Sequence, residues 1–183
     1  MEREKGFILG ACEDGTFYYR GKKNQYTIEI EQKIYEWLEI VKKAFYRVYN
    51  KNSNLRKTSK GFYRLTIYSK KIYNELLETR KNYKKVLERS KEYQIGFLQG
   101  VFDAEGTVHN KRYSIRVASK KKEVINVIKE ILEKLKIKTG KIYKDKTIYV
   151  LPLYGKENLI RFLNIIGFRH PQKKKKLLKL IPG

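Results

Sequence analysis

The chain has 183 residues, which is enough for one ordinary domain or for two fused half-domains of roughly 90 residues each. Its 43 Lys and Arg residues against 19 Asp and Glu residues give a formal net charge of +24, so the expected partner is a polyanion. The basic residues are spread along the chain and no apolar run approaches the ~18 residues needed to cross a bilayer, which favours nucleic acid over a membrane.

Two halves of the chain carry the same predicted elements in the same order, which indicates an internal repeat. Each half begins with a short apolar helix that ends in an acidic residue and a glycine, at residues 6–15 and at residues 95–106. A strand is inferred next, at 16–20 and at 107–111. An alternating strand then follows, at 26–33 and at 113–120, and these two align without a gap at an offset of 87 residues.

Alternation gives these two strands one apolar and one polar face. The residues expected on the apolar faces are Tyr26, Ile28, Ile30, Tyr113, Ile115 and Val117. An amphipathic helix follows in each half, at 34–49 and at 122–137. A further strand and a last helix complete each half, at 62–70 and 71–82 in the first and at 147–156 and 157–166 in the second.

The predicted fold class is therefore α+β, with two pseudo-symmetric repeats at residues 1–86 and 92–183 and a charged linker at 87–91. Helices should cover one face of each sheet and leave the polar face open. A curved antiparallel sheet with an open polar face can enter the major groove of DNA, where its side chains read base edges and Lys and Arg hold phosphates.

The helix that opens the second half contains the nine-residue segment LQGVFDAEG, from Leu98 to Gly106. This segment resembles the signature of the LAGLIDADG endonucleases, with a central glycine and an acid directly before the last glycine. Gly100 and Ala104 lie four residues apart on one helical face, where small side chains let a second helix approach closely. Gly106 is expected to end the helix in the left-handed conformation, with Glu105 at its tip.

An acid at a helix C-terminus favours a bound cation, because that end of a helix already carries partial negative charge. A single cysteine, Cys12, and only two histidines exclude an internal disulfide and any zinc site built from these residues, so oxygen must hold any metal. Two parallel helices would bring Glu105, its counterpart and the carbonyls of Gly15 and Gly106 into an oxygen-rich site of the kind that Mg²⁺ prefers. Such ions polarise a phosphate and activate water.

The first motif, from Phe7 to Gly15, is one residue short of the family pattern. Gly10 precedes Gly15 by five residues, whereas the corresponding glycines of the second motif are six apart. Counting back from Gly15, Asp14 corresponds to Glu105 and is the expected second metal ligand. Two alternatives stay open at this point, namely that Glu13 replaces Asp14 or that the first ligand has been lost.

Beyond the motifs, the sequence is similar over almost its full length to the monomeric archaeal members of the family. There the strand after the first motif ends in Gln-Lys, which is found here as Gln32 and Lys33, and Ser119 and Lys120 stand at the related place. The resemblance implies that Gln32 and Ser119 orient water or metal, and that Lys33, Lys120 and also Lys121 stabilise phosphate charge. The alternative is that these lysines are solvated surface residues.

The resemblance also implies a saddle of two αββαββα domains whose signature helices form the central interface. Both DNA strands would be cut across the minor groove, leaving 3′ overhangs. Because one chain holds both halves, no partner subunit is required and the target need not be a palindrome. We therefore expect a monomeric, Mg²⁺-dependent, site-specific double-strand endonuclease. Since the N-terminus lacks the apolar region of a signal peptide, we expect it in the cytoplasm.

Outward side chains of the strands are the candidates for contacts to bases. They are Arg20, Gln25, Thr27, Glu29, Glu31, Arg64, Thr66, Tyr68, Arg112, Ser114, Arg116, Thr147 and Tyr149. Glu29 and Glu31 are unusual on a DNA face. An acid can accept from cytosine N4, and the alternative is that both are paired to lysines.

The lysine-rich tail, residues 172–179, is interpreted as a peripheral phosphate clamp or as a solvated arm. Two other functions remain open. The shortened first motif allows an RNA maturase that acts on intron RNA, or a DNA-binding protein that no longer cuts. The charge alone also allows a basic scaffold for a protein partner, whose binding would lack the steep salt dependence of nucleic-acid binding.

Overall fold

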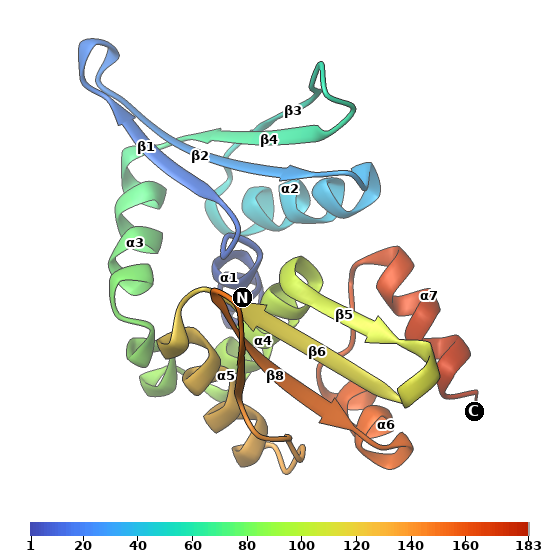
Figure 1. The fold of residues 1–183 in the computed structure, drawn as a ribbon. Helices are drawn as coiled ribbons and strands as arrows, with labels where there is room; N and C mark the ends of the chain where they lie inside the picture. The colour runs from blue at the N-terminus through green and yellow to red at the C-terminus, as the bar shows by residue number, and fades with distance from the viewer. Residues whose placement is uncertain (183) are drawn as a thin grey trace.

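The computed structural model describes residues 1–182 and contains two sheets of four antiparallel strands (Figure 1). The first half consists of α1 (Glu2–Ala11), β1 (Thr16–Arg20), β2 (Gln25–Gln32), α2 (Tyr35–Tyr49), β3 (Asn54–Lys57), β4 (Tyr63–Tyr68) and α3 (Lys70–Lys81). The second half consists of α4 (Lys91–Glu105), β5 (Gly106–His109), β6 (Ser114–Ser119), α5 (Lys122–Lys134), β7 (Tyr143–Asp145), β8 (Ile148–Tyr154) and α6 (Lys156–Ile165). The predicted α+β fold, with two repeats in a saddle, is confirmed.

The two sheets have matching strand orders, β1-β2-β4-β3 and β5-β6-β8-β7. In Figure 1, α2 and α3 lie below the first sheet, and α4, α5 and α6 lie behind the second. The apolar strand faces turn toward these helices, and Ile28, Leu65, Ile115 and Leu153 are fully buried. Within residues 1–182, these five helices leave the opposite face of each sheet open.

Parallel packing of α1 against α4 joins the halves. A Cβ added at Gly10 would lie 2.2 Å from the carbonyl oxygen of Phe97, and one added at Gly100 would lie 2.2 Å from that of Phe7. Gly6 and Gly96 make equally close backbone approaches. The helices therefore meet through Gly96 and Gly100, four residues apart, and not through the predicted pair of Gly100 and Ala104. Ala104 lies beyond the tightest contact and is only partly buried.

Short 3-10 helices replace parts of the predicted strands and linker. Residues Asn110–Arg112 form η3, so the strand predicted at 107–111 ends at His109. The prediction for Tyr113 is wrong, since its φ of 42° is left-handed and its side chain is 47% exposed. A tight connection between β5 and β6 requires this turn. The charged boundary segment includes η2 (Tyr83–Glu88), with Tyr83 and Val86 buried.

The C-terminal segment is a helix, α7 (Pro171–Leu180), and not the solvated arm considered from its lysines. Pro171 begins it, and the side chain of His170 accepts a hydrogen bond from the backbone nitrogen of Lys173 at 3.4 Å. Leu177 is fully buried and Leu180 is 8% exposed, so two leucines dock the helix, while Lys174, Lys175, Lys176 and Lys179 are exposed.

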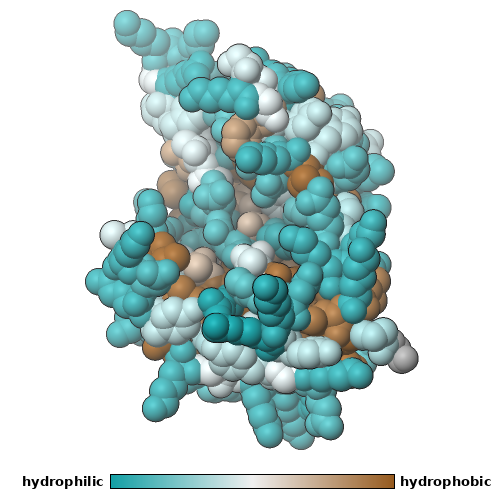
Figure 2. All heavy atoms as spheres, turned by 45° about the vertical axis from the view of Figure 1, so that its right-hand side comes forward, coloured by the Kyte–Doolittle hydropathy of each residue, from teal (hydrophilic) through white to brown (hydrophobic). Residues whose placement is uncertain are grey.

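Most of the surface seen in Figure 2 is hydrophilic, and hydrophobic side chains are visible only in small areas. No helix among residues 1–182 is both long and apolar enough to span a membrane.

Candidate active site

The second signature helix ends at Glu105, as predicted, but Gly106 does not take the left-handed conformation. Its φ of −77° and ψ of 148° are extended, and it begins β5 directly. A Cβ at this position would lie 2.4 Å from the carbonyl oxygen of Phe102. Glycine is therefore required because the strand departs so close to the last helical turn, and not because of a positive φ.

The first signature helix ends earlier than predicted, at Ala11, and Glu13 and Asp14 lie in a turn. The backbone nitrogen of Glu13 donates to the carbonyl of Gly10 at 3.1 Å, and that of Gly15 donates to the carbonyl of Cys12 at 2.9 Å. These tight bonds are the physical consequence of the missing residue, since the chain must turn toward β1 over a shorter path. The turn nevertheless brings Asp14 to the same end of the helix pair as Glu105.

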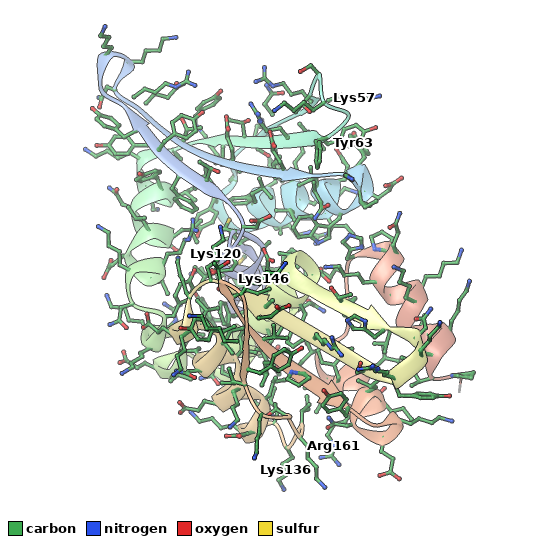
Figure 3. The ribbon with its side chains drawn as sticks, viewed as in Figure 1. Lys57, Tyr63, Lys120, Lys136, Lys146 and Arg161 are labelled. Carbon is green, nitrogen blue, oxygen red and sulfur yellow. The ribbon has the colours of Figure 1, made fainter. Side chains whose placement is uncertain are left out.

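Asp14 and Glu105 line one hollow of about 300 Å³ at the seam between the halves, here called the Asp14 hollow. Its other lining residues are Glu13, Arg80, Ala118, Ser119, Lys120, Lys121 and Ile148. Figure 3 labels Lys120 near this seam. The structure therefore brings together the acids of both motifs with Ser119 and Lys120 of the second sheet.

Burial raises the pKa values of two acids of this hollow, and nearby negative charge adds to the rise at Glu105. Burial, together with the nearby charges of Asp14 and Glu13, raises the pKa of Glu105 to about 7. Partial loss of solvent also raises the pKa of Asp14, although the charges of Lys120 and Arg80 oppose that rise. Two carboxylates that resist ionisation beside each other form a site where a positive ion is favoured.

Glu13 and Asp14 differ in how far they are engaged by the protein. One carboxylate oxygen of Glu13 accepts from the hydroxyl of Tyr83, and the other accepts from Ser119 Oγ at 3.5 Å. The Asp14 side chain is exposed and has no hydrogen bond or ion pair to residues 1–182. Of the two acids, Asp14 is the one left free for a ligand.

Gln32 and Lys33 lie in a second hollow of about 460 Å³, here called the Gln32 hollow, which also contains Glu105 and Gly106. Its other lining residues are Ile34, Ala104, Thr107, His170, Gln172, Lys173 and Lys176. Gln32 Oε1 accepts from the backbone nitrogen of Lys33 at 2.9 Å. Glu105 therefore stands between two hollows that contain lysines, one beside the strand end of each sheet.

Two cations that the sequence analysis missed hold the ends of the signature motifs. Arg80 donates to the carbonyl oxygen of Gly15 at 3.2 Å and to that of Glu13 at 3.3 Å. Lys173 donates to the carbonyl oxygen of Phe102 at 3.2 Å and to that of Asp103. Burial lowers the pKa of Lys173 to about 8. Each cation neutralises the partial negative charge at the end of a helix or turn. The only feature of the sequence that could have indicated this role was a basic residue in a later helix.

Asp103 is the inner acid of the second motif, and its contacts give it a structural role. It is fully buried and accepts from Trp37 Nε1 and from the backbone nitrogens of Arg169 and His170, each at 3.1 Å. Burial raises its pKa to about 6. Because Trp37 belongs to α2, this carboxyl joins the first half to the second and is fully engaged.

The open face of the first sheet carries most of the predicted base-reading residues. The register places Glu31 opposite Arg64 and Thr27 opposite Tyr68, with Arg20 opposite Gln25 at the hairpin end. Glu31 and Glu29 are paired, as one alternative held, but to Arg64 and not to lysine. Thr27 and Thr66 lie on this face but are buried under their longer neighbours, so they are withdrawn from solvent.

The second sheet departs further from the predicted set. Arg116 lies on the open face, opposite Thr107 and Pro152, whereas Ser114 is fully buried. Arg112 lies in η3 and Thr147 in the turn before β8, so neither belongs to a strand. Tyr149 lies on the same face of β8 as Leu151 and Leu153 and packs against the core. Its prediction as an outward residue is therefore wrong.

The donor set at the seam fits a divalent cation. Two carboxylates from different halves share the Asp14 hollow, and both have raised pKa values that a bound cation would reverse. No group of three or more His, Cys, Asp and Glu side chains with suitable placement exists within residues 1–182. Further ligands would therefore be backbone carbonyls, water or phosphate. The carbonyl of Gly15 already accepts from Arg80.

Another hollow, of about 600 Å³, lies away from these acids. It is lined by Lys136, Lys138, Tyr154, Gly155, Lys156, Glu157, Asn158 and Arg161. Figure 3 shows Lys136 and Arg161 at the end of the second half that is far from Lys120. It contains one carboxylate and no histidine or cysteine, so it lacks the groups for hydrolysis that meet at the seam.

Comparison with known proteins gives consistent matches. A family model described as a LAGLIDADG-like domain matches residues 92–167. Homing endonuclease I-ApeI of Aeropyrum pernix is 30% identical over 192 residues, an alignment that covers 96% of this chain and 86% of the relative.

Among solved structures, I-DmoI in complex with DNA and Ca has a TM-score of 0.77 and 22% identity, covering 97% of this chain and 98% of that chain. I-DmoI in complex with DNA and Mn has a TM-score of 0.75 and 23% identity, covering 91% and 97%. At these identities the structural likeness concerns the fold.

Proposed function

This chain belongs to the LAGLIDADG homing endonuclease family, and on that premise we propose that it cuts both strands of double-stranded DNA at a specific site. The relative of 30% identity is a homing endonuclease, and the structures of similar fold contain DNA and divalent metal ions. The observation that carries the proposal is the meeting of Asp14 and Glu105, from different halves, in one hollow beside Lys120.

We propose Asp14 and Glu105 as the carboxylate ligands of a divalent cation, and Mg²⁺ as that cation. Asp14 is favoured over Glu13 because Glu13 already accepts from Tyr83 and Ser119. A bound divalent cation supplies Lewis-acid polarisation of the scissile phosphate and lowers the pKa of water. The backbone carbonyls of Gly15 and Gly106, which directly follow the two acids, would be further oxygen ligands, that of Gly15 through its second lone pair because it already accepts from Arg80.

The other residues of the two hollows position the substrate. Lys120 and Lys121 in the Asp14 hollow, and Lys33 in the Gln32 hollow, are placed to hold phosphate oxygens and to stabilise the charge that develops during cleavage. Ser119 and Gln32 offer neutral hydrogen-bonding groups to water. Two hollows on either side of Glu105 support one cut in each strand, and both would be made by a single chain.

The test is replacement of Glu105 by Gln, which keeps the size of the side chain and removes its charge. We expect double-strand cleavage to fall by about 10³-fold or more, because a ligand of the cation that polarises the phosphate is lost. Binding to the same duplex should stay within a few-fold of the wild type. The measurement is Mg²⁺-dependent linearisation of plasmids that carry duplexes selected by binding.

Glu157→Gln provides the matched control, because Glu157 is an exposed carboxylate in the distant hollow. That variant should cut at the wild-type rate. Cleavage by Glu105→Gln at the wild-type rate would overturn the assignment of the ligand. Replacing Asp14 by Asn should give the same loss, whereas the same loss on Glu13→Gln but not on Asp14→Asn would move the ligand to Glu13.

The shortened first motif favours one second candidate, an RNA maturase or DNA-binding protein of the same fold that does not cut. Such a protein would bind the duplex in the presence of Mg²⁺ without cutting either DNA strand, and it would promote splicing of an intron RNA. Asp14 stays exposed and unengaged by other residues of the described chain, which argues for retained cleavage.

A further inference from the structure

Arg64 and two glutamates form a cluster in the middle of the open face of the first sheet. Glu31 lies directly opposite Arg64 in the pairing of β2 with β4. Arg64 Nε donates to Glu31 Oε1 at 2.6 Å, and its Nη2 donates to the same oxygen. Glu29 Oε2 lies 3.8 Å from Arg64 Nε, and Glu29 Oε1 also accepts from the hydroxyl of Tyr18 at 2.7 Å.

This pattern of bonds fixes the guanidinium in one orientation. Arginine has five N–H bonds in a planar fork. Glu31 takes the edge formed by Nε and Nη2, so the end of the fork, with one N–H from Nη1 and one from Nη2, stays free. No other hydrogen-bond partner of Arg64 exists within residues 1–182. The side chain is 30% exposed, which leaves that end accessible.

Stability alone gives little reason for such a cluster. An exposed ion pair contributes little to folding, and two carboxylates on a surface that must approach phosphates repel the ligand. A carboxylate that orients an arginine offsets this repulsion, because less conformational entropy is lost when the arginine binds. The free pair of parallel N–H bonds matches the two acceptors, O6 and N7, that guanine presents in the major groove.

We propose that Arg64, held side-on by Glu31, is the specificity-determining residue of the first sheet and binds O6 and N7 of a guanine. The part of the target under the first sheet then contains one required G·C pair. This inference rests on the proposed function only in assuming that the open faces bind duplex DNA.

The chain offers a matched control in Arg56. It lies directly opposite Arg64 in the pairing of β3 with β4, on the same open face, and is exposed. No carboxylate lies within 4.0 Å of its guanidinium in the described residues. Arg56 therefore provides the same charge in nearly the same place without a partner that orients it, as expected of a phosphate contact.

The test begins with selection of duplexes from a randomised library by the full chain, in buffer with EDTA so that bound DNA stays intact. We expect one position with a nearly invariant guanine that becomes variable when Arg64→Ala or Arg64→Lys is used. Replacing this guanine by adenine should weaken wild-type binding by about 5- to 150-fold and leave Arg64→Ala unaffected. Replacing it by 7-deazaguanine, which lacks N7, should act in the same direction with a smaller effect.

Arg56→Ala should weaken binding to all duplexes alike and keep the selected guanine. The proposal is overturned if Arg64→Ala selects the same bases as the wild type, or if 7-deazaguanine weakens both proteins equally. If the wild type selects no sequence and binds no duplex, the proposed function fails instead, so the two failures are distinguishable.

Discussion

At the scale of single residues, His170 shows how burial sets the protonation state of a side chain that begins a helix. The residue is 4% exposed, and the Nδ1 of its ring accepts from the backbone nitrogen of Lys173. Burial and the charges of Lys173 and Lys176 lower its pKa to about 4. Trp37 packs against the ring with centroids 6.1 Å apart, and Asp103 accepts from its backbone nitrogen. Native His170 is therefore neutral.

This predicts a loss of stability on acidification. The unfolded chain protonates His170 below its ordinary pKa of about 6.5, whereas the native protein resists protonation down to about 4, so stability falls between these values. The expected loss is up to about 3 kcal/mol. His170→Asn keeps an acceptor at the start of α7 without the titration and should remove this loss.

The measurement is urea unfolding of both proteins from pH 7.5 to pH 4. Asp103, with its pKa raised to about 6, makes a contribution to the free energy of unfolding that becomes more favourable as pH falls, and this contribution is the same in both proteins. The difference between them therefore isolates His170. Parallel pH profiles of the two proteins would contradict the prediction.

Sequence reasoning identified those residues of the Asp14 hollow whose place depends on local pattern. Glu105 and Asp14 were identified by counting from a glycine, and Lys120 by its place at a strand end, and the three line one hollow. Arg80 and Lys173 were not found, because their role exists only where α3 and α7 meet helix ends far away in the sequence. The burial of Thr27 was missed for a similar reason, since long side chains of adjacent strands cover it.

At the scale of elements, the α1 and α4 pair depends on the absence of side chains. Gly10 and Gly100 each face the backbone of the other helix, and neither neighbour is a flexible side-chain tip. Gly10→Ala would place a methyl carbon 2.2 Å from the carbonyl oxygen of Phe97. The helices would have to separate, so we expect a loss of about 3 kcal/mol or more in the free energy of unfolding.

Gly21→Ala is the control for this substitution. Gly21 lies in η1 (Gly21–Lys23), and a Cβ there would have its nearest neighbour at 3.8 Å, the ordinary distance of van der Waals contact. Its stability in urea should equal that of the wild type. A Gly10→Ala protein as stable as Gly21→Ala would show that the interface is looser than the structure indicates.

The elements that could be predicted from sequence were those with a clear period. Alternation located β2 and β6, and the helical period located α2, each to within one residue at either end, and it located α5 with an end three residues too late. The end of α1 could not be predicted, since one missing residue changed a helical turn into a tight turn. The helix α7 was missed because a run of lysines hid the two leucines that dock it.

At the scale of the whole molecule, the two halves are linked well beyond the glycine contact. Asp103 in α4 accepts from Trp37 in α2, and Arg169 of the second half lies 2.7 Å from Glu4 in α1. Arg169 also stacks over the ring of Phe7 at 4.1 Å. These contacts hold both open sheets in a fixed relation, so a duplex bound along one sheet meets the other without a domain movement.

The net charge of +24 predicts the last measurable property, which is the salt dependence of duplex binding. Each phosphate neutralised by Lys or Arg releases counterions, so log K should fall linearly with log salt with a slope of about −0.9 for each contact. If the bound duplex covers both hollows and both sheets, the protein should make about 6–10 such contacts. Its affinity should then fall by about 10³- to 10⁵-fold between 50 and 200 mM salt.

Two variants make this prediction specific. Arg56→Ala, on the open face, should reduce the magnitude of the slope by about one contact. Lys129→Ala should leave it unchanged, because Lys129 lies on α5, behind the second sheet, and is 3.5 Å from Glu133. A basic scaffold for a protein partner would show a shallow slope that neither substitution changes. Equal effects of the two substitutions would mean that DNA does not lie along the open faces.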